Sequence, residues 1–441
     1  MLFSSWRSRR AVPRPKVLPT TEKGKDMELK RRINEYHKYL FVLIGFASAT
    51  NLNSSLITEN VFNCANFANK CNFAFFFSGF ISFLIALFFL NLNFKSLLVY
   101  GWTLVPVQLS LVLIGIYGNG ITARNSFIVV YALHGMLEGF IIQSCTFVIS
   151  QLFLNSTIAL VFAGYPAANI AIGYIQYVLE NAIGMGNMFK MRLCLVLCLI
   201  SQMVVTFVGV GWATFLYIKY ASDETENPPI TYKWSRFRRF LKALIHIRYY
   251  YPRFLLSAVA NFVRIFFFPC FIPFVFKISH TAKLLISLTF TFCDFIGIIS
   301  ASKVNETIDP SNKRDSQTHT GFLFSRDTHL HLISVLVLTT CSFTLWVSCN
   351  NSYEFVRAPE VIFFITVVTC FLNGRIYGRG LNGCNPILEY YNRQADAHGN
   401  KIVADEILEM DNTINDVAIA LEYALSALSS SLSNITEQII F

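Results

Sequence analysis

The feature that most constrains this chain is a succession of long apolar runs, each about as long as a membrane is thick. A helix crosses the hydrocarbon core in about 20 mostly apolar residues. In lipid every backbone amide needs a partner within the protein, so such runs must be helical. The sequence therefore predicts eleven membrane-spanning helices. The predicted spans are 39–58, 72–92, 96–117, 126–150, 157–179, 193–220, 252–276, 282–302, 330–348, 361–380 and 417–439.

The last of these spans has the weakest pattern. It contains Glu422, Glu437 and a run of three serines that begins at Ser429. Spanning helices rarely tolerate such polarity, so an amphipathic helix at the membrane interface is the alternative. The other spans agree with the composition, because charged residues make up only 14% of the chain, against about 25% in soluble domains.

Basic residues gather in two places, an N-terminal arm over 1–38 and a loop over 221–251. Both flank apolar spans, so the positive-inside rule explains them better than binding to nucleic acid does, and it predicts a cytoplasmic N-terminus. Within the loop, apolar residues recur at helical spacing among basic ones, which indicates an amphipathic helix on the inner membrane face. The loop separates six spans over 39–220 from five over 252–441. We therefore expect an all-α, polytopic membrane protein with a 6+5, major-facilitator-like arrangement of two bundles.

Three ionisable residues stand out inside predicted spans, Glu138, Arg264 and Asp294, and Arg375 lies toward the end of the span at 361–380. Such residues are costly in lipid and usually face a cavity or a partner. Each also has an alternative to a functional role. Glu138 could be protonated and hydrogen-bonded to a neighbouring helix, and Arg264 and Asp294 could form a structural ion pair. No phosphate-binding loop, metal cluster or catalytic triad is evident in the sequence, so neither an enzyme nor a cofactor is expected.

Two cysteines, Cys64 and Cys71, fall in one short polar stretch between spans. A disulfide between them and two separate thiols are both compatible with the sequence.

Several short motifs resemble those of the equilibrative nucleoside transporters. The run ALHGMLEG at 132–139, followed by LFLNSTIALVFAGYPAA at 152–168, is similar to an N-G-x-x-Q-G-like and a G-Q-G-L-A-G-like element of that family. Glu138 stands where the family has a substrate-contacting Gln. Gly164 matches a motif glycine, and Tyr165 and Pro166 replace the Gln and Gly after it.

Further likenesses follow in the same order along the chain. LIG at 43–45 through Asn53 resembles the family's L-L-G…P-W-N element, and Phe268-Pro269 resembles its F-P. CDFIG at 293–297 resembles F-D-W-L-G-R, and FLNG at 371–374 resembles F-S-N-G. The resemblance implies that Asn53, Leu56, Glu138 and Asp294 bind substrate. It also implies motif or gating roles for Gly164, Tyr165, Phe268, Pro269 and Asn373.

One departure from the family pattern concerns the partner of Asp294. The family has an Arg where this chain has Ile298, and that Arg pairs with the Asp. Arg264 and Arg375 are therefore candidate partners for Asp294. The replacement of Gln by Glu138 adds a second carboxyl group, which leaves both facilitative and proton-coupled transport open.

The resemblance implies a carrier for nucleosides or nucleobases in the plasma membrane, with a small molecule and the lipid bilayer as its partners. Two other functions are compatible with the same fold. One is transport of another polar metabolite, and the other is a membrane protein that descends from a transporter but does not transport. The oligomeric state has no signal in the sequence.

Overall fold

The structure is a computed structural model that describes residues 37, 39–49, 57–58, 61–64, 67–90, 92–152, 159–183, 187–220, 258, 260–262, 280–304, 359–382, 419–421, 423–429 and 431–432. Several sequence predictions lie outside these residues. They are the basic arm over 1–38 except His37, the loop at 221–251, the span at 330–348 and most of the span at 252–276. The predicted site residues Asn53, Leu56, Arg264, Phe268 and Pro269 also lie outside.

The described elements are all α-helices. They are α2 (Leu40–Ser48), α4 (Phe67–Phe89), α5 (Phe94–Tyr117), α6 (Gly120–Leu152), α7 (Ala159–Ile183), α8 (Met188–Tyr220), α12 (His280–Val304) and α14 (Pro359–Asn382).

These helices confirm the predicted fold class, an all-α polytopic membrane protein. Four helical stretches are long and apolar enough to cross a membrane by length and composition: Phe67–Phe89, Phe94–Tyr117, Gly120–Thr146 and Met188–Lys219. Helix α8 has 33 residues, or about 50 Å at 1.5 Å per residue. It therefore extends beyond a hydrocarbon core of about 30 Å.

The distribution of side chains is that of a protein surrounded by lipid. Along α4, Phe73, Phe77, Ile81 and Ile85 recur at every fourth position, and each is between 38% and 47% exposed. This spacing places them on one helix face, where an aqueous surface would favour polar residues. Polar side chains such as Gln108 are instead buried inside the helix bundle.

Glycines bring the helices into close contact at three crossings. At the crossing of α2 and α7, a Cβ on Gly164 would overlap the backbone nitrogen of Phe46 and the carbonyl oxygen of Val42. At the crossing of α4 and α6, a Cβ on Gly139 would overlap the Ser82 hydroxyl. At the crossing of α12 and α14, a Cβ on Gly297 would lie 2.5 Å from the carbonyl oxygen of Phe371. Small residues allow such contacts in membrane helices, where apolar side chains gain little from leaving lipid.

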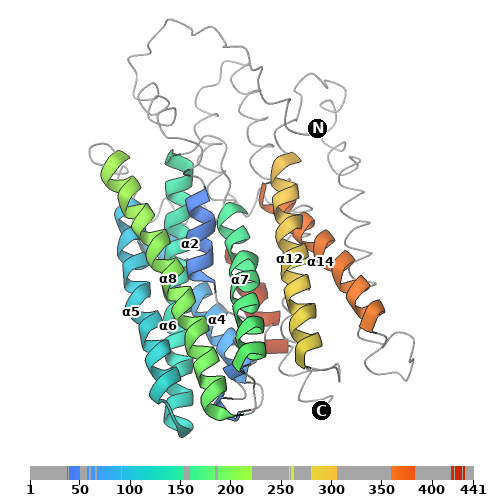
Figure 1. The fold of residues 1–441 in the computed structure, drawn as a ribbon. Coiled ribbons are helices and arrows are strands. Elements are labelled where there is room, and N and C mark those ends of the chain that lie inside the picture. Colours follow the sequence, from blue (N-terminus) through green and yellow to red (C-terminus); the bar gives the residue numbers. More distant parts are fainter. Residues whose placement is uncertain are drawn as a thin grey trace, which may run out of the picture.

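The helices form an N-terminal group (α2 and α4 to α8) and a C-terminal pair (α12 and α14). Helix α7 lies between them, against α2 on one side and α12 on the other (Figure 1). The ring of Phe162 on α7 meets that of Tyr377 on α14 edge to face, with centroids 5.9 Å apart. Helix α7 is thus one element through which the two sets of helices meet.

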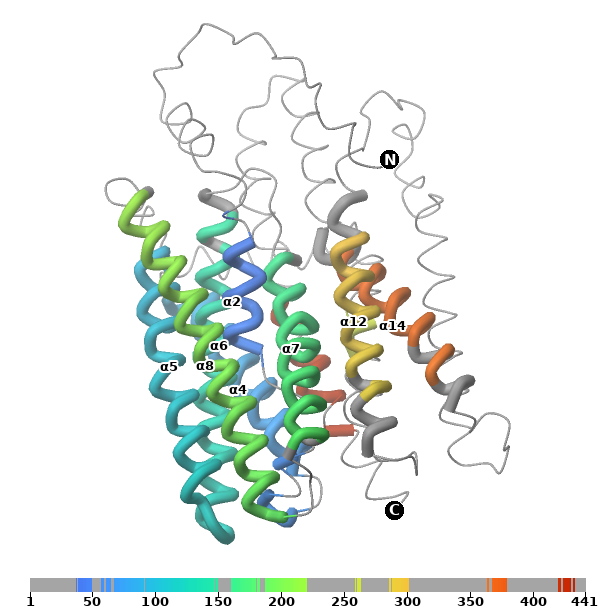
Figure 2. Tube along the Cα trace, in the orientation of Figure 1, coloured from blue at the N-terminus to red at the C-terminus, as the bar shows by residue number. Residues whose placement is uncertain are grey.

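The helix at Ile419–Ser429 makes a second connection (Figure 2, red). The ring of Tyr423 lies 5.9 Å from that of Phe83 on α4. Two serines of this helix face the protein. The amide of Asn261 donates to the Ser426 hydroxyl at 3.0 Å, and the hydroxyl of Ser429, the first residue of the serine run, donates to the Phe262 carbonyl at 2.9 Å. Burial of these two hydroxyl groups accounts for their polarity, and whether this helix spans the membrane stays a prediction.

Helix α2 ends inside the protein, and the prediction of one unbroken helix over 39–58 is therefore wrong. Ala49 is extended, with φ −61° and ψ 137°, and Ala47, Ser48 and Ala49 are all buried. A helix end leaves carbonyl groups without intrahelical partners, which is expensive away from water. Side chains on two neighbouring helices supply the missing donors. Gln108 on α5 donates to the Ala47 carbonyl at 3.0 Å, and Gln202 on α8 donates to the Ala49 carbonyl.

We expect Gly164→Ala to lower the Tm of the purified protein in detergent, because the added methyl group meets backbone atoms that cannot rotate away. Overpacking of this kind typically costs about 1–3 kcal/mol. The matched control is Gly211→Ala on α8, where an added Cβ has open space around it. Equal Tm values for the two variants would contradict the close crossing of α2 and α7.

We expect Gln202→Leu to destabilise the protein by about 1–3 kcal/mol, because it leaves the buried carbonyl of Ala49 without its donor. Thermal unfolding in detergent measures the effect. Ser201→Ala is the control, since its hydroxyl bonds only the Leu197 carbonyl of its own helix, at 2.8 Å. A Gln202→Leu variant as stable as Ser201→Ala would show that another group satisfies the end of α2.

Candidate functional site

The carboxyl group of Glu138 lies in the middle of α6 and is fully buried. Gly135 and Gly139, one on each side of it in the sequence, hold α6 against α4, and this close contact keeps water away. Glu138 shares a helix face with His134 and Ile141. Ile141 lines a small cavity together with Ile44 and Ala47 of α2, so this face of α6 looks toward the end of α2.

His134 is a buried polar residue that is absent from the predicted site. Its imidazole is 1% exposed and makes edge-to-face contacts with the rings of Phe75, at 5.6 Å, and Tyr131, at 6.3 Å. The carbonyl of Ser48 is within electrostatic reach of the ring. Among the described residues, the backbone of Ser48 is therefore the polar neighbour of this ring. Its spacing of four residues from Glu138 is the sequence signal that could have identified it.

The amide and hydroxyl groups at the end of α2 are also absent from the predicted site. Besides Gln108 and Gln202, the Thr206 hydroxyl approaches the Ala47 carbonyl at 3.5 Å. In sequence these are single polar residues within long apolar runs. Their common role becomes visible only when α5 and α8 are placed around α2.

In the C-terminal pair, the structure brings together two residues that the resemblance singles out. The side-chain amide of Asn373 on α14 donates to a carboxylate oxygen of Asp294 on α12 at 3.4 Å. Both side chains are buried. Gly374 follows Asn373 directly, and a Cβ there would overlap the carbonyl oxygen of Asp294, so the helices are close enough for this contact.

The candidate cationic partners of Asp294 are placed differently. Ile298, where the family has its Arg, is buried, whereas Arg375 is exposed on α14. Asn373 is a partner of Asp294 in this structure, and a pairing of Asp294 with Arg375 stays a prediction. Arg264 lies outside the described residues.

The motif residues of α7 lie at its contacts with other helices. Gly164 is at the crossing with α2. Tyr165 stacks on Phe162, with ring centroids 5.7 Å apart and planes at 16°, and Phe162 in turn meets Tyr377 of α14. Tyr165 is therefore part of an aromatic contact that joins α7 to α14.

The cysteines of the predicted disulfide lie at the start of α4. Cys64 is partly buried just before the helix, and Cys71 is buried within its second turn. Both are thiols in this structure, and the disulfide between them stays a prediction.

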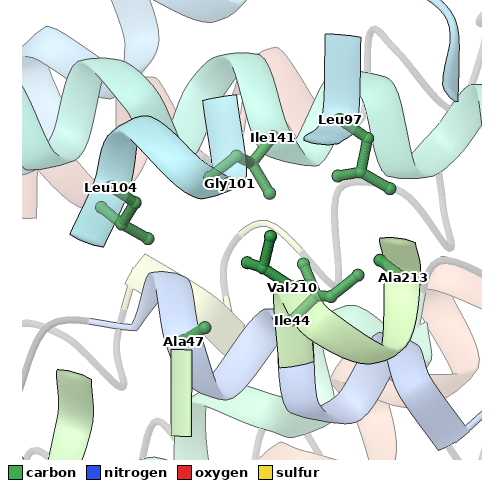
Figure 3. A pocket seen from close by; sticks show the side chains of 8 residues that line it. All are labelled: Ile44, Ala47, Leu97, Gly101, Leu104, Ile141, Val210 and Ala213. Atoms are coloured by element: carbon green, nitrogen blue, oxygen red, sulfur yellow. The ribbon is translucent and has the colours of Figure 1, made fainter. Parts of the chain in front are cut away.

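A cavity lies apart from the acidic residues, within the N-terminal group (Figure 3). Its volume of about 10 Å³ is roughly what a single water molecule needs. Its lining carries only apolar side chains, so it is a gap in packing rather than a place for a polar ligand. The lining residues are Ile44, Ala47, Leu97, Gly101, Leu104, Ile141, Val210 and Ala213.

Comparison with known proteins identifies the fold. No family model and no curated protein matches the sequence, but several solved structures align with most of the chain. A D-xylose-proton symporter aligns at a TM-score of 0.58 and 11% identity, over 92% of this chain and 88% of its own. The xylose transporter XylE from E. coli, in a partially occluded inward-open conformation, gives a TM-score of 0.55 and 10% identity, over 91% and 90%.

A third similar structure is FucP, a Major Facilitator Superfamily transporter in its outward conformation, with a TM-score of 0.49 and 13% identity over 91% of this chain and 99% of that one. At identities this low, similarity extends to the fold and not to the cargo. The two xylose transporters therefore establish that this chain has a major-facilitator-like arrangement of transmembrane helices.

Proposed function

We propose that this chain is a membrane carrier that moves nucleosides or nucleobases by alternating access, in a facilitative or proton-coupled manner. The observation that carries the proposal is a buried carboxyl group in each set of helices, Glu138 on α6 and Asp294 on α12. Ionisable residues within membrane helices most often belong to a substrate or ion pathway. The fold shared with the two xylose transporters supports the same class of function.

In this carrier, the N-terminal group and the helices after the central loop are two bundles that rock against each other. The contacts of α7 with α12 and of Tyr423 with α4 join them. Alternating access requires such contacts to break on one side of a fixed site and form on the other. Asn53, Leu56 and Phe268 would line that site together with the two carboxyl groups.

Glu138 and Asp294 would accept hydrogen bonds from the base edge or from the ribose hydroxyls. The amide of Asn373 donates to one oxygen of Asp294 and so fixes the position of this carboxyl group. A hydrogen bond to a charged group contributes about 1.5–3 kcal/mol, so losing one of these carboxylates should weaken transport roughly tenfold to hundredfold.

Another polar metabolite is the second candidate cargo, and the structural comparisons favour it in one respect. The two solved structures that share the fold most clearly are a xylose transporter and a D-xylose-proton symporter. A sugar offers the same hydroxyl donors to carboxylates that a ribose does. The nucleoside proposal rests on the motif resemblance, and the sugar alternative rests on the fold alone.

Glu138→Ala and Asp294→Ala should each reduce uptake of radiolabelled nucleoside by at least about tenfold in transport-deficient cells, because each removes a charged hydrogen-bonding group. Uptake is normalised to the amount of protein in the membrane. Thr289→Val is the control, since Thr289 bonds only its own helix, through the Leu285 carbonyl at 2.8 Å. Unchanged uptake in both Ala variants would remove the two carboxyl groups from the mechanism.

Competition by unlabelled compounds should identify the cargo. We expect nucleosides or nucleobases to inhibit uptake and xylose to have no effect, because the motifs of the binding helices resemble those of nucleoside carriers. The same panel measured at mildly acidic and neutral pH tests proton coupling. Faster uptake in acid would show a coupled carrier, and equal uptake a facilitative one. Inhibition by sugars but not by nucleosides would replace the proposed cargo with the second candidate.

A further inference from the structure

Two pairs of aromatic rings connect the N-terminal group to helices from the second half of the chain. Phe162 on α7 meets Tyr377 on α14 edge to face, with ring centroids 5.9 Å apart and planes at 87°. Phe83 on α4 meets Tyr423 of the helix at Ile419–Ser429, also with centroids 5.9 Å apart. All four side chains are buried. Aromatic pairs contribute more than the area they bury, so both contacts hold the two sets of helices together.

The path of the chain places both ring pairs on one side of the membrane. Helix α4 ends on this side, α5 leads away from it, and α6 leads back. The six residues 153–158 reach at most about 21 Å, which is less than the hydrocarbon core of about 30 Å, so α7 begins on the side where α6 ends. Phe83 is six residues before the end of α4, and Phe162 is three residues after the start of α7.

The positive-inside rule predicts that this side is the cytoplasmic one. Helix α8 ends on it, because α8 starts on the side where α7 ends and crosses once. The basic loop over 221–251 follows that end. The basic arm reaches the same side, since the indole of Trp212, near the end of α8, donates to the imidazole of His37 at 3.2 Å. The two ring pairs therefore lie toward the predicted cytoplasmic side.

The pair of Phe83 and Tyr423 lies one helical turn beyond Glu138 in that direction. A Cβ on Gly139 would lie 2.5 Å from the carbonyl oxygen of Gly79, so the crossing of α4 and α6 places Glu138 at the level of Gly79. Phe83 follows Gly79 by four residues, or about one turn toward the end of α4. Gly79 also makes room for the ring of Tyr423, since a Cβ there would lie 2.9 Å from a carbon of that ring.

The pair of Phe162 and Tyr377 has the same relation to Asp294. Tyr377 follows Asn373, which donates to the carboxylate of Asp294, by four residues. It lies five residues before the end of α14 and 18 residues after its start, a length of about 27 Å. Because Phe162 is close to the start of α7, α14 stays within the membrane only if its own start points to the opposite side. Tyr377 is therefore one turn nearer to the predicted cytoplasmic side than Asn373.

We propose that these two ring pairs form the closed cytoplasmic gate of the carrier, and that the structure is the state closed toward the cytoplasm. This inference rests on the proposed function and names the contacts that must separate during transport. Both pairs lie between a buried carboxyl group and the cytoplasmic side, so release of cargo to that side requires the rings of each pair to part. Dispersion contacts between rings are lost within a small separation, which allows rocking of the bundles to open them.

The test joins one ring pair covalently. Phe162→Cys and Tyr377→Cys are combined in the full-length protein, which is reconstituted into proteoliposomes and treated with a short bifunctional methanethiosulfonate. Each thiol forms a disulfide with one end of the reagent and displaces a sulfinate, and dithiothreitol reverses the link. Uptake of radiolabelled adenosine is measured before the reagent, after it, and after dithiothreitol. Mass spectrometry of the digested protein gives the linked fraction.

The matched control is the pair Phe73→Cys and Phe77→Cys. These two rings stack with centroids 5.5 Å apart, but both are exposed on a single helix, α4. A link between them therefore joins no two bundles. Wild type and the single-cysteine variants receive the same reagent, which accounts for reaction at the native cysteines.

We expect the reagent to lower uptake at least about tenfold in Phe162→Cys/Tyr377→Cys, because linked helices cannot rock apart. Dithiothreitol should restore the uptake measured before the reagent. The linked protein should still bind adenosine in detergent, since the link leaves both carboxyl groups untouched. The control pair, the single variants and wild type should keep their uptake.

Undiminished uptake by protein that is fully linked between α7 and α14 would overturn the inference and leave the proposed function intact. If this variant does not fold, Phe83→Cys/Tyr423→Cys is judged by the same criteria in its place. A wild-type protein that takes up xylose instead of adenosine would refute the proposed cargo, and the same links would then be tested on xylose uptake. A wild-type protein that takes up neither would refute the proposed function, and the gate with it.

Discussion

The need to satisfy every backbone hydrogen bond away from water determines most of this structure. It makes each apolar run a helix, and it makes any break in a helix depend on the residues around it. Helix α2 shows the second effect: it ends at Ser48 inside the bundle because Gln108 and Gln202 donate to its last carbonyls. Without these two side chains, a helix end at this depth would be costly.

Close helix contact through glycine is the second constraint, and it coincides with the candidate site. Glu138 is followed by Gly139, Asn373 is followed by Gly374, and Asp294 precedes Gly297 by three residues. Each of these glycines lies where two helix backbones nearly touch. The polar side chains are therefore held among backbone dipoles in a region closed to water. Hydrogen bonds are strongest there, and an unsatisfied group costs the most.

These two constraints together shape the region that the proposed carrier would use. The N-terminal group and the C-terminal pair each hold a buried carboxyl group. Helix α7 packs against α12, and Tyr423 packs against Phe83 of α4. Acidic groups distributed over two sets of helices can bind a polar molecule between them. The contacts of Phe162 on α7 and of Tyr423 use aromatic rings.

The sequence by itself determined the fold class, because the length and polarity of the apolar runs leave only membrane-spanning helices as a solution. It also singled out Glu138 and Asp294, since ionisable residues in such runs are conspicuous, and it singled out Asn373 through the motif resemblance. Only the tertiary structure decided that Asn373 bonds Asp294, that α2 ends at Ser48, and that His134 lies beside that end. These facts depend on which helices lie side by side. Hydropathy measures how a segment prefers lipid to water, and it carries no information about the neighbours that satisfy a buried carbonyl or carboxylate.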